Sequence, residues 1–300
     1  MSDQPFRIGI IGVGGIAVLG HIPALRSTPR AEITALCRRS EGPLRIAQER
    51  LGVQEAYTDW REMLDRAPLD GVIVCTPHDL HTAPTIAALE RGLHVLLEKP
   101  MALRFQDAWA MVEAARQAGR VLMLAYGDRF KGNSRAARQA VDEGRIGTVR
   151  QVSGIGVGSQ RFYWTQDVVP EDWQQFLKSA TGLPDAFFGN WNLDGYWRGD
   201  PARTGGGSFA DGGSHGVDRL LWFGGAPPRD VMAFTESVGL PAECYINVQA
   251  RLANGVFLSI VSGNIATPFP GVMGGTSALM ITGDGGVLTM DDQGSYWLVS

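Results

Sequence analysis

Three ionisable side chains, Lys99, Asp211 and His215, have the types and spacing of a proton-transfer site. Lys99 follows the short apolar run Leu93–Leu97, and Pro100 directly after it predicts a break at the strand end rather than a continuing helix. A lysine that is desolvated beside a bound ligand can have its pKa lowered toward neutrality, which allows it to exchange a proton. We therefore interpret Lys99 as a catalytic acid/base; a surface lysine paired with the neighbouring glutamate is the alternative.

Asp211 and His215 lie four residues apart within Ser208–Trp222, a segment whose pattern predicts a helix. Residues at that spacing share one helix face, so a carboxylate and an imidazole there can bind one substrate hydroxyl or relay a proton with Lys99. Asp218, one turn further on, extends the row. From the residues alone, a carboxylate favoured by the helix N-terminus and a satisfied core histidine remain the alternative.

A glycine-rich turn, GVGGIA, directly follows the apolar strand predicted at Phe6–Ile11. Its first glycine permits a tight turn, the next lets a pyrophosphate approach bare backbone, and Ala17 keeps the following helix close to the strand. This pattern is typical of a dinucleotide-binding turn. The cofactor-binding residues expected in it are Gly12, Gly14, Gly15 and Ile16.

Two further strand ends are predicted to meet the same cofactor. Glu98 and Lys99 end one strand, and Thr76, Pro77 and His78 follow another, at the edge where open α/β sheets bind ligands. We expect the second group near the nicotinamide-side ribose. We expect the nearby His81 to orient this loop or to cap the next helix, whereas His21 and His94 carry no chemical signal.

The end of the second strand bears on which cofactor binds. An NAD-preferring site usually has an acidic residue there, but this chain has Arg38, Arg39 and Ser40. Arginines and a serine suit a 2′-phosphate through charge-assisted hydrogen bonds, which favours NADP over NAD. Two solvated arginines are the alternative, and Glu41 directly after them weakens the case.

The elements that must position these residues alternate between strand and helix over the first 125 residues. Short apolar runs separated by amphipathic segments predict a doubly wound parallel sheet covered on both faces, an α/β Rossmann-type domain over residues 1–126. The predicted strands are Phe6–Ile11, Glu32–Cys37, Gly71–Cys75, Leu93–Leu97 and Val121–Ala125. The predicted helices, beyond the one after the glycine turn, lie near Gly42–Leu51, Leu80–Arg91 and Phe105–Ala118.

Residues 127–300 predict a second, substrate-binding and oligomerisation α/β domain. A helix near Ser134–Gly144 and a strand at Thr148–Gly156 precede a long irregular stretch, Gly158–Gly207. From about Arg229, apolar and polar residues alternate between glycine-rich turns, which predicts a large open mixed or antiparallel sheet with one covered face.

The irregular stretch is predicted to form the variable wall of a substrate pocket, because aromatic faces pack against sugar rings and polar side chains there can bind hydroxyls. An oligomer contact is the alternative, and some of these aromatics must belong to the core. The aromatic residues are Phe162, Tyr163, Trp164, Trp173, Trp191, Tyr196 and Trp197, and the polar ones are Asn190, Asn192 and Arg198. Arg129 is a weaker substrate-binding candidate.

Composition restricts the class of protein. Three hundred residues with 44% hydrophobic content are enough for two domains, and a net charge of −4 gives no reason to expect nucleic-acid or membrane partners. Three scattered cysteines indicate a reducing compartment, and no cluster has metal-ligand spacing, so we expect no metal. The N-terminus resembles no signal peptide, and no run is long enough to span a membrane, which predicts a cytoplasmic protein.

Five segments occur in an order and spacing that resemble the glucose–fructose oxidoreductase / inositol dehydrogenase / rhizopine-catabolism family. They are GVGGIA, CTPHDLH (Cys75–His81), GLHVLLEKPMA (Gly92–Ala102), DEGRIGTVR (Asp142–Arg150) and GGGSFADGGSHGVDRLLWFGG (Gly205–Gly225). The resemblance implies an NAD(P)-dependent dehydrogenase acting on a sugar, cyclitol or related polyol, with its substrate-binding Asp and His at Asp211 and His215. It also implies a homo-oligomer, a dimer or tetramer, formed through the C-terminal sheet.

Two other functions share this fold. One is a glycosidase whose cofactor is oxidised and reduced within a single turnover, and the other is a sensor that binds NAD(P) and sugar without catalysis. Lys99 together with Asp211 and His215 argues against the sensor, because binding alone needs no proton-transfer residues.

Family members usually continue through at least one more strand and a helix after the strand predicted at Ser295–Ser300. We therefore expect either a truncated chain or a trimmed sheet.

Overall fold

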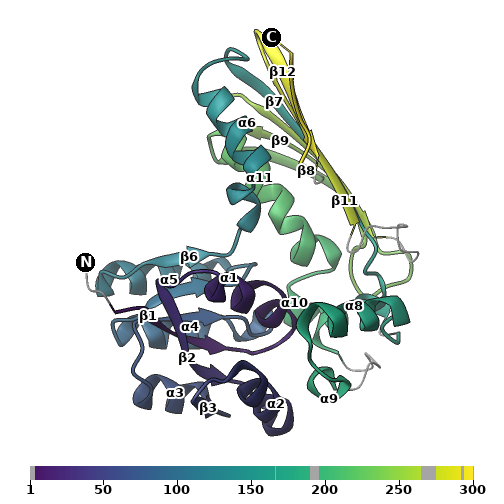
Figure 1. Cartoon of the computed structure of the whole chain (residues 1–300). Helices are drawn as coiled ribbons and strands as arrows, with labels where there is room; N and C mark the ends of the chain where they lie inside the picture. Colours follow the sequence, from purple (N-terminus) through teal and green to yellow (C-terminus); the bar gives the residue numbers. More distant parts are fainter. Residues whose placement is uncertain (1–3, 166, 190–195, 265–274, 292–293, 300) are drawn as a thin grey trace. The chain divides into compact units, whose positions relative to one another are not determined.

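The computed structural model describes residues 4–165, 167–189, 196–264, 275–291 and 294–299 (Figure 1). These residues form two compact units. The first comprises residues 1–125, 167–197 and 202–205, and the second comprises residues 126–166, 198–201 and 206–300. The sequence prediction placed a boundary after residue 126; the segments 167–197 and 202–205, which follow it in the chain, pack with the first unit. Among the described residues, no helix is both long and apolar enough to cross a bilayer.

The first unit is built on a six-stranded parallel sheet with the order β3-β2-β1-β4-β5-β6. The order reverses between β1 and β4, so the chain leaves these neighbouring strands toward opposite sides, the arrangement in which open α/β sheets bind ligands. The predicted doubly wound sheet is confirmed. The strands are β1 (Phe6–Ile11), β2 (Ala31–Cys37), β3 (Glu55–Tyr57), β4 (Gly71–Val74), β5 (His94–Leu97) and β6 (Leu122–Leu124).

Helices cover both faces of this sheet, and alternate strand residues enter separate cores. Ile11, Val72 and Val74 pack with the core under α3, α4 and α5, whereas Ile10 and Leu36 pack with the core under η1, α1 and α2. These helices are η1 (a π-helical turn, Ala17–His21), α1 (Ile22–Arg26), α2 (Glu41–Leu51), α3 (Trp60–Arg66), α4 (Thr82–Glu90) and α5 (Phe105–Ala118). The sequence prediction missed β3 and α3, because three and seven residues are too short to show a periodic pattern.

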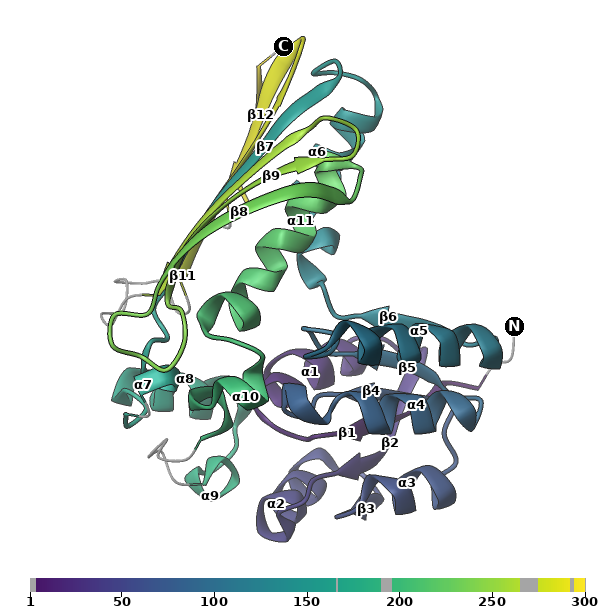
Figure 2. The ribbon, with the colours of Figure 1, turned by 180° about the vertical axis from the view of Figure 1, so that it is seen from behind.

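The second unit is a seven-stranded mixed sheet with the order β13-β12-β11-β7-β10-β9-β8. Only the β7–β10 pair is parallel among its described pairs. Helices α6 (Gly132–Asp142) and α11 (Ser214–Gly224) pack on one face, over a core that includes Val152, Leu220 and Ile260 (Figure 2). The strands are β7 (Val149–Gly158), β8 (Pro228–Glu236), β9 (Tyr245–Leu252), β10 (Phe257–Asn264), β11 (Gly275–Gly283), β12 (Gly286–Asp291) and β13 (Tyr296–Val299).

The stretch predicted to be irregular, Gly158–Gly207, instead contains several short helices. Helix α8 (Glu171–Thr181) is the longest of those described, and Trp173 and Leu177 form its buried face. The prediction was wrong because the glycines and prolines of this stretch do not prevent short helices from forming between them. The other described helices there are α7 (Phe162–Thr165), α9 (Asp185–Phe188), η4 (Trp197–Gly199) and α10 (Pro201–Thr204). Asn190, Trp191 and Asn192 lie outside the described residues.

The turn between β11 and β12 offers a direct test of the second unit's packing. A methyl group on Gly283 would overlap the backbone carbonyl of Ile146, so Gly283→Ala should lower the free energy of unfolding by about 1–3 kcal/mol. Gly285→Ala is the matched control, because the nearest atom to its added methyl lies at 3.5 Å. Urea unfolding followed by near-ultraviolet circular dichroism measures both. Equal stability of the two variants would contradict the described register.

Candidate active site

The glycine turn after β1 closes tightly against two neighbouring strands. The N–H groups of Gly12 and Val13 both donate to the carbonyl of Cys37 at the end of β2, at 2.9 and 3.2 Å. Gly12 has a φ of +93°, and a Cβ there would lie 2.7 Å from backbone atoms of Cys75 and Thr76. A Cβ on Gly15 would meet no atom within 4 Å. The turn therefore requires glycine at its start and leaves open space over its exposed side, which fits a pyrophosphate.

Arg38 lies directly beside this turn. Its Nη1 donates to the carbonyl of Val13 at 3.1 Å, and its guanidinium lies 4.7 Å from the centre of the Phe187 ring. Burial lowers the pKa of Arg38. Arg39 and Ser40 are exposed, and Ser40 precedes α2 without capping it through its side chain. The structure thus separates the three predicted residues: Arg38 is half-buried within the unit, while Arg39 and Ser40 point into solvent.

The loop after β4 brings together two residues predicted for different roles. His78 is buried, its Nδ1 lies 3.1 Å from the carbonyl of Thr204, and its ring meets Trp197 edge-to-face with centroids 4.7 Å apart. Asp79, the next residue, forms an ion pair with Arg203 at 3.0 Å. Trp197, predicted to bind substrate, therefore packs on the loop predicted to bind the cofactor.

The backbone at Lys99 is held by a carboxylate. Oε2 of Glu98 accepts a hydrogen bond from the Lys99 N–H at 3.1 Å, and Oε1 lies 2.8 Å from Nε2 of His21. Burial by itself would raise the pKa of Glu98, but the hydrogen bond and charge of His21, with the charge and N–H of Lys99, outweigh it and lower that pKa. Both carboxylate oxygens of Glu98, predicted to bind cofactor, are thus engaged within the protein.

Asp211 is buried within the second unit and forms an ion pair. It lies in a π-helical turn, η5 (Phe209–Gly213), that leads into α11, and its Oδ2 accepts from Nε of Arg198 at 2.8 Å. The Arg198 guanidinium lies 5.1 Å from the centre of the Tyr163 ring. Arg198 and Asp211, both predicted to bind substrate, are therefore direct partners, and a hydroxyl bound by one would also be oriented by the other.

His215, in the first turn of α11, packs against the segment that follows β6. Its ring meets Tyr126 edge-to-face at 5.7 Å. Arg129, in the adjacent turn η3 (Gly127–Phe130), forms a bidentate pair with Asp218, with distances of 2.7 and 2.5 Å. Two of the residues considered for the substrate site, Arg129 and Asp218, thus bind each other across η3 and α11.

Two residues that the sequence interpretation missed hold the segments that carry candidate groups. Oε2 of Glu243 accepts the N–H of Gly207 at 2.8 Å, and the Glu243 carbonyl accepts the N–H of Ser208 at 3.0 Å, which fixes the loop before Asp211. The other is His21, the partner of Glu98. Neither had a local signal, because Glu243 lies 36 residues from its partner Gly207 and His21 lies 77 residues from Glu98.

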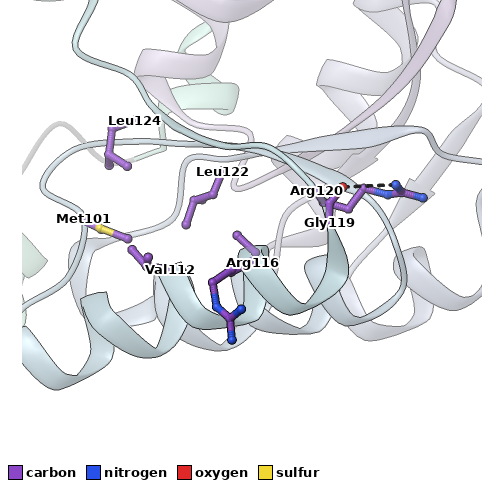
Figure 3. Close-up of a pocket in the computed structure, with 8 residues that line it drawn as sticks. Met101, Val112, Arg116, Gly119, Arg120, Leu122 and Leu124 are labelled. Carbon is purple, nitrogen blue, oxygen red and sulfur yellow. Dashed lines mark hydrogen bonds between the residues drawn. The ribbon is translucent and has the colours of Figure 1, made fainter.

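Some predicted wall residues belong to the core. Trp164, Trp173 and Phe162 are buried, as expected for the aromatics of this stretch that belong to the core. A separate cavity of about 420 Å³ lies along edge strand β6 and α5 (Figure 3). Its walls come from residues such as Met101, Val112 and Leu122, and it includes none of the candidate catalytic residues. Among the described residues, no group of His, Cys, Asp or Glu side chains is placed to hold a metal ion.

Comparison with known proteins agrees with this architecture. The model of an oxidoreductase family with an NAD-binding Rossmann fold (GFO/IDH/MocA) matches residues 6–126, and the GFO/IDH/MocA C-terminal domain matches residues 185–289. Myo-inositol 2-dehydrogenase of Thermotoga maritima is 34% identical over 141 residues, 47% of this chain and 42% of the relative. A 1,5-anhydro-D-fructose reductase of Ensifer adhaerens is 31% identical over 237 residues, 79% of this chain and 62% of the relative.

A solved structure shares both units. The WlbA dehydrogenase from Bordetella pertussis, in complex with NADH and UDP-GlcNAcA, superposes with a TM-score of 0.78 and 25% identity, covering 97% of this chain and 75% of that one. The match to the two curated relatives covers only part of their length: 42% of the myo-inositol 2-dehydrogenase and 62% of the 1,5-anhydro-D-fructose reductase. Because two models of one family match residues 6–126, which contain the glycine turn, and residues 185–289, which contain most strands of the second sheet, the chain belongs to the GFO/IDH/MocA oxidoreductase family.

Proposed function

We propose that this protein is an NAD(P)-dependent oxidoreductase that transfers a hydride between the nicotinamide and a hydroxyl or carbonyl carbon of its substrate. One observation carries the proposal. The Gly12 turn and Lys99 lie at the carboxyl ends of β1 and β5 in one parallel sheet, whose strand order reverses between β1 and β4. That edge combines a cradle for a pyrophosphate with an ionisable amine.

The chemistry assigned to the chain's own residues is proton transfer. When bound, the nicotinamide accepts or gives up the hydride. In the oxidation direction, the substrate hydroxyl must lose its proton as the carbonyl forms, and the neutral Nζ of Lys99 takes that proton. In the reduction direction the ammonium returns it. We assign Asp211 and His215 to orienting the substrate hydroxyls, with Arg198 holding the Asp211 carboxylate.

We assign the substrate to sugars, cyclitols or related polyols. The relatives named above act on a cyclitol and on an anhydrosugar ketone, and another relative is a D-apiose dehydrogenase of Paraburkholderia graminis. The partly buried Arg198–Asp211 pair supplies hydrogen-bonding groups, and the half-buried Trp197 supplies apolar surface, of the kind that sugars require. A thermal-shift panel of sugars and cyclitols, with each cofactor, identifies a working substrate.

Replacing Lys99 tests the assigned chemistry. Lys99→Met should lower kcat by about 100-fold or more, because the group assigned to take the hydroxyl proton is removed. NADPH affinity, measured by fluorescence, should stay close to that of the wild type, because the pyrophosphate binds at the Gly12 turn. Lys178→Met is the matched control, since Lys178 pairs with Asp185 at 3.2 Å on the surface. A Lys99→Met protein with near-normal turnover would refute the assignment of proton transfer to Lys99, whereas a wild-type protein that binds cofactor and sugar without turnover would favour a sensor.

We further propose that NADP is preferred over NAD. The end of β2 carries Arg39 and Ser40, both exposed, where an NAD-preferring site has a carboxylate. Arg38 already donates to the Val13 carbonyl and lies over the Phe187 ring, so its guanidinium is held beside the turn and is not the first candidate to bind a 2′-phosphate. Arg39 is therefore the main candidate to bind a 2′-phosphate, with the Ser40 hydroxyl as a second donor.

Arg39→Ala should weaken NADPH binding without changing NADH binding. A charge-assisted hydrogen bond is worth about 1.5–3 kcal/mol, which corresponds to at least a tenfold rise in the Kd for NADPH. Arg45→Ala on α2 is the control, because Arg45 pairs with Glu41 and Gln48 instead. Isothermal titration with both cofactors measures the ratio. Equal weakening of both cofactors, or no change, would disprove the preference.

We also propose that the protein is a homo-oligomer that pairs through the open face of its second sheet. Strand alternation places Ile155, Val261 and Met280 on the face opposite Leu258 and Ile260, and these three side chains are 52%, 42% and 41% exposed. Ile155 and Val261 are cross-strand partners at the centre of the sheet. An apolar sheet face of this kind is self-complementary about a two-fold axis.

Val261→Asp should dissociate the oligomer, because it places a charge at the centre of the proposed contact. Val121→Asp, at an exposed valine of the first unit, is the control. Light scattering after size exclusion should give the monomer mass for Val261→Asp and the oligomer mass for the wild type and the control. A wild-type monomer, or an oligomer that survives Val261→Asp, would overturn this assignment.

A further inference from the structure

Two histidines that the proposed chemistry does not use lie on either side of Lys99 in the first unit. His21 is in η1, the turn that follows the dinucleotide cradle, and His81 directly precedes α4. Each reaches the Glu98–Pro100 segment from a different part of the chain. Both are largely or wholly enclosed: the His21 side chain is 15% exposed, and His81 is 0% exposed.

His81 connects two backbone carbonyls. Its Nδ1 lies 2.9 Å from the carbonyl of Pro100, and its Nε2 lies 2.9 Å from the carbonyl of Thr76. The ring thus links the loop after β4 to the residue that follows Lys99. Because carbonyl oxygens only accept, each contact requires the ring nitrogen to donate. A neutral imidazole can donate to one of the two carbonyls at a time.

His21 acts on the other side of Lys99, through Glu98. Its Nε2 lies 2.8 Å from Oε1 of Glu98, and Oε2 of the same carboxylate accepts the Lys99 N–H. The carboxylate is therefore fixed by His21 and in turn fixes the Lys99 peptide. The backbone is held immediately before Lys99 by Glu98 and immediately after it by His81, so the direction in which the Lys99 side chain leaves the strand end is set from both sides.

We propose that His81 and His21 are positioning residues for Lys99, which together form a backbone clamp around it; this inference rests on the proposed role of Lys99. The clamp connects the lysine to both cofactor segments, the glycine turn through η1 and the loop after β4 through Thr76. His81 is not itself a catalytic residue, because a fully buried ring makes no contact with substrate. A displacement of about 1 Å in a reacting group can cost about 100-fold in rate, so such a clamp has a direct effect on turnover.

Two amide substitutions separate the two contacts of His81. The amide of Asn reaches about as far as Nδ1 and that of Gln about as far as Nε2. His81→Asn therefore keeps a donor for Pro100, and His81→Gln keeps a donor for Thr76. If the Pro100 contact positions Lys99, His81→Asn should retain most of kcat and His81→Gln should lose about tenfold or more. NADPH affinity and KM should change little in either. Thermal melts check that the two variants are equally stable.

A second readout needs neither substrate nor cofactor. Acetic anhydride modifies each neutral lysine at a rate that depends on its surroundings, and mass spectrometry follows Lys99 against the chain's other two lysines, Lys131 and Lys178, as internal standards. His81→Gln should change the relative rate at Lys99 several-fold, and His81→Asn should leave it near the wild-type value. On the other side of the clamp, His21→Gln should retain this rate and His21→Ala should change it.

The outcomes distinguish this inference from the proposed function. If Lys99→Met abolishes turnover while His81→Asn and His81→Gln are equally active and equally reactive at Lys99, the clamp is refuted and the catalytic role of Lys99 stands. If cofactor affinity falls in parallel with kcat, His81 acts on the cofactor site instead and the clamp is also refuted. If Lys99→Met is fully active, the proposed role of Lys99 fails and the clamp loses its basis, whatever the acetylation rates show.

Discussion

At Gly12, the backbone leaving β1 passes so close to the backbone leaving β4 that no side chain fits between them. The approach follows from strand pairing: β1 and β4 are parallel neighbours, and the N–H of Cys75 still donates to the carbonyl of Ile11 at 2.7 Å after the regular strand has ended. Because the two chains then diverge to opposite faces, this is the point where the sheet opens. The cradle, the loop after β4 and the Lys99 segment all start from this edge.

The edge is rigid because polar contacts link segments far apart in the sequence. His21 on η1 binds Glu98 after β5, and His81 binds the carbonyls of Thr76 and Pro100. The His81 ring lies against backbone carbonyls that would otherwise need another partner, whereas His21 binds a side-chain carboxylate. A carboxylate that is 8% exposed is tolerated there because the imidazole and a backbone N–H both bind it, which also keeps its pKa low.

In the second unit, helix packing and ion pairs likewise hold the candidate substrate-binding residues in place. One face of its sheet is buried under α6 and α11, and the same helix α11 begins just after the turn that carries Asp211. Ion pairs fix this region: Arg198 with Asp211, and Arg129 with Asp218. Partly buried pairs of this kind contribute more to the orientation of the groups than to stability, since their attraction is offset by the cost of desolvating both charges.

Local pattern was sufficient to predict much of this protein. The alternating apolar runs located five strands of the first sheet, α5 was predicted with its observed bounds, and the glycine spacing indicated the turn after β1. Strand periodicity also predicted the second sheet but left its type open as mixed or antiparallel, and the parallel pairing of β7 with β10 makes it mixed. These features depend on neighbours in sequence, so composition and spacing carry them. The contacts between side chains could not be predicted in this way. His21 lies 77 residues from its partner Glu98, Arg198 lies 13 from Asp211, and Glu243 lies 36 from Gly207, and a pattern of neighbouring residues does not indicate such pairs.

The sequence by itself therefore determined the fold class, the strand ends that carry chemistry and the residue types available there. Only the tertiary structure decided which side chains remain available and which are held by others. Arg38, Glu98 and Arg129 all had suitable chemistry for a ligand, and the structure shows that each also binds a protein group. His21, which carried no sequence signal, became the partner of a buried carboxylate. The physical reason is that hydrogen bonds and ion pairs form between groups brought close by sheet pairing and helix packing, whatever their separation along the chain.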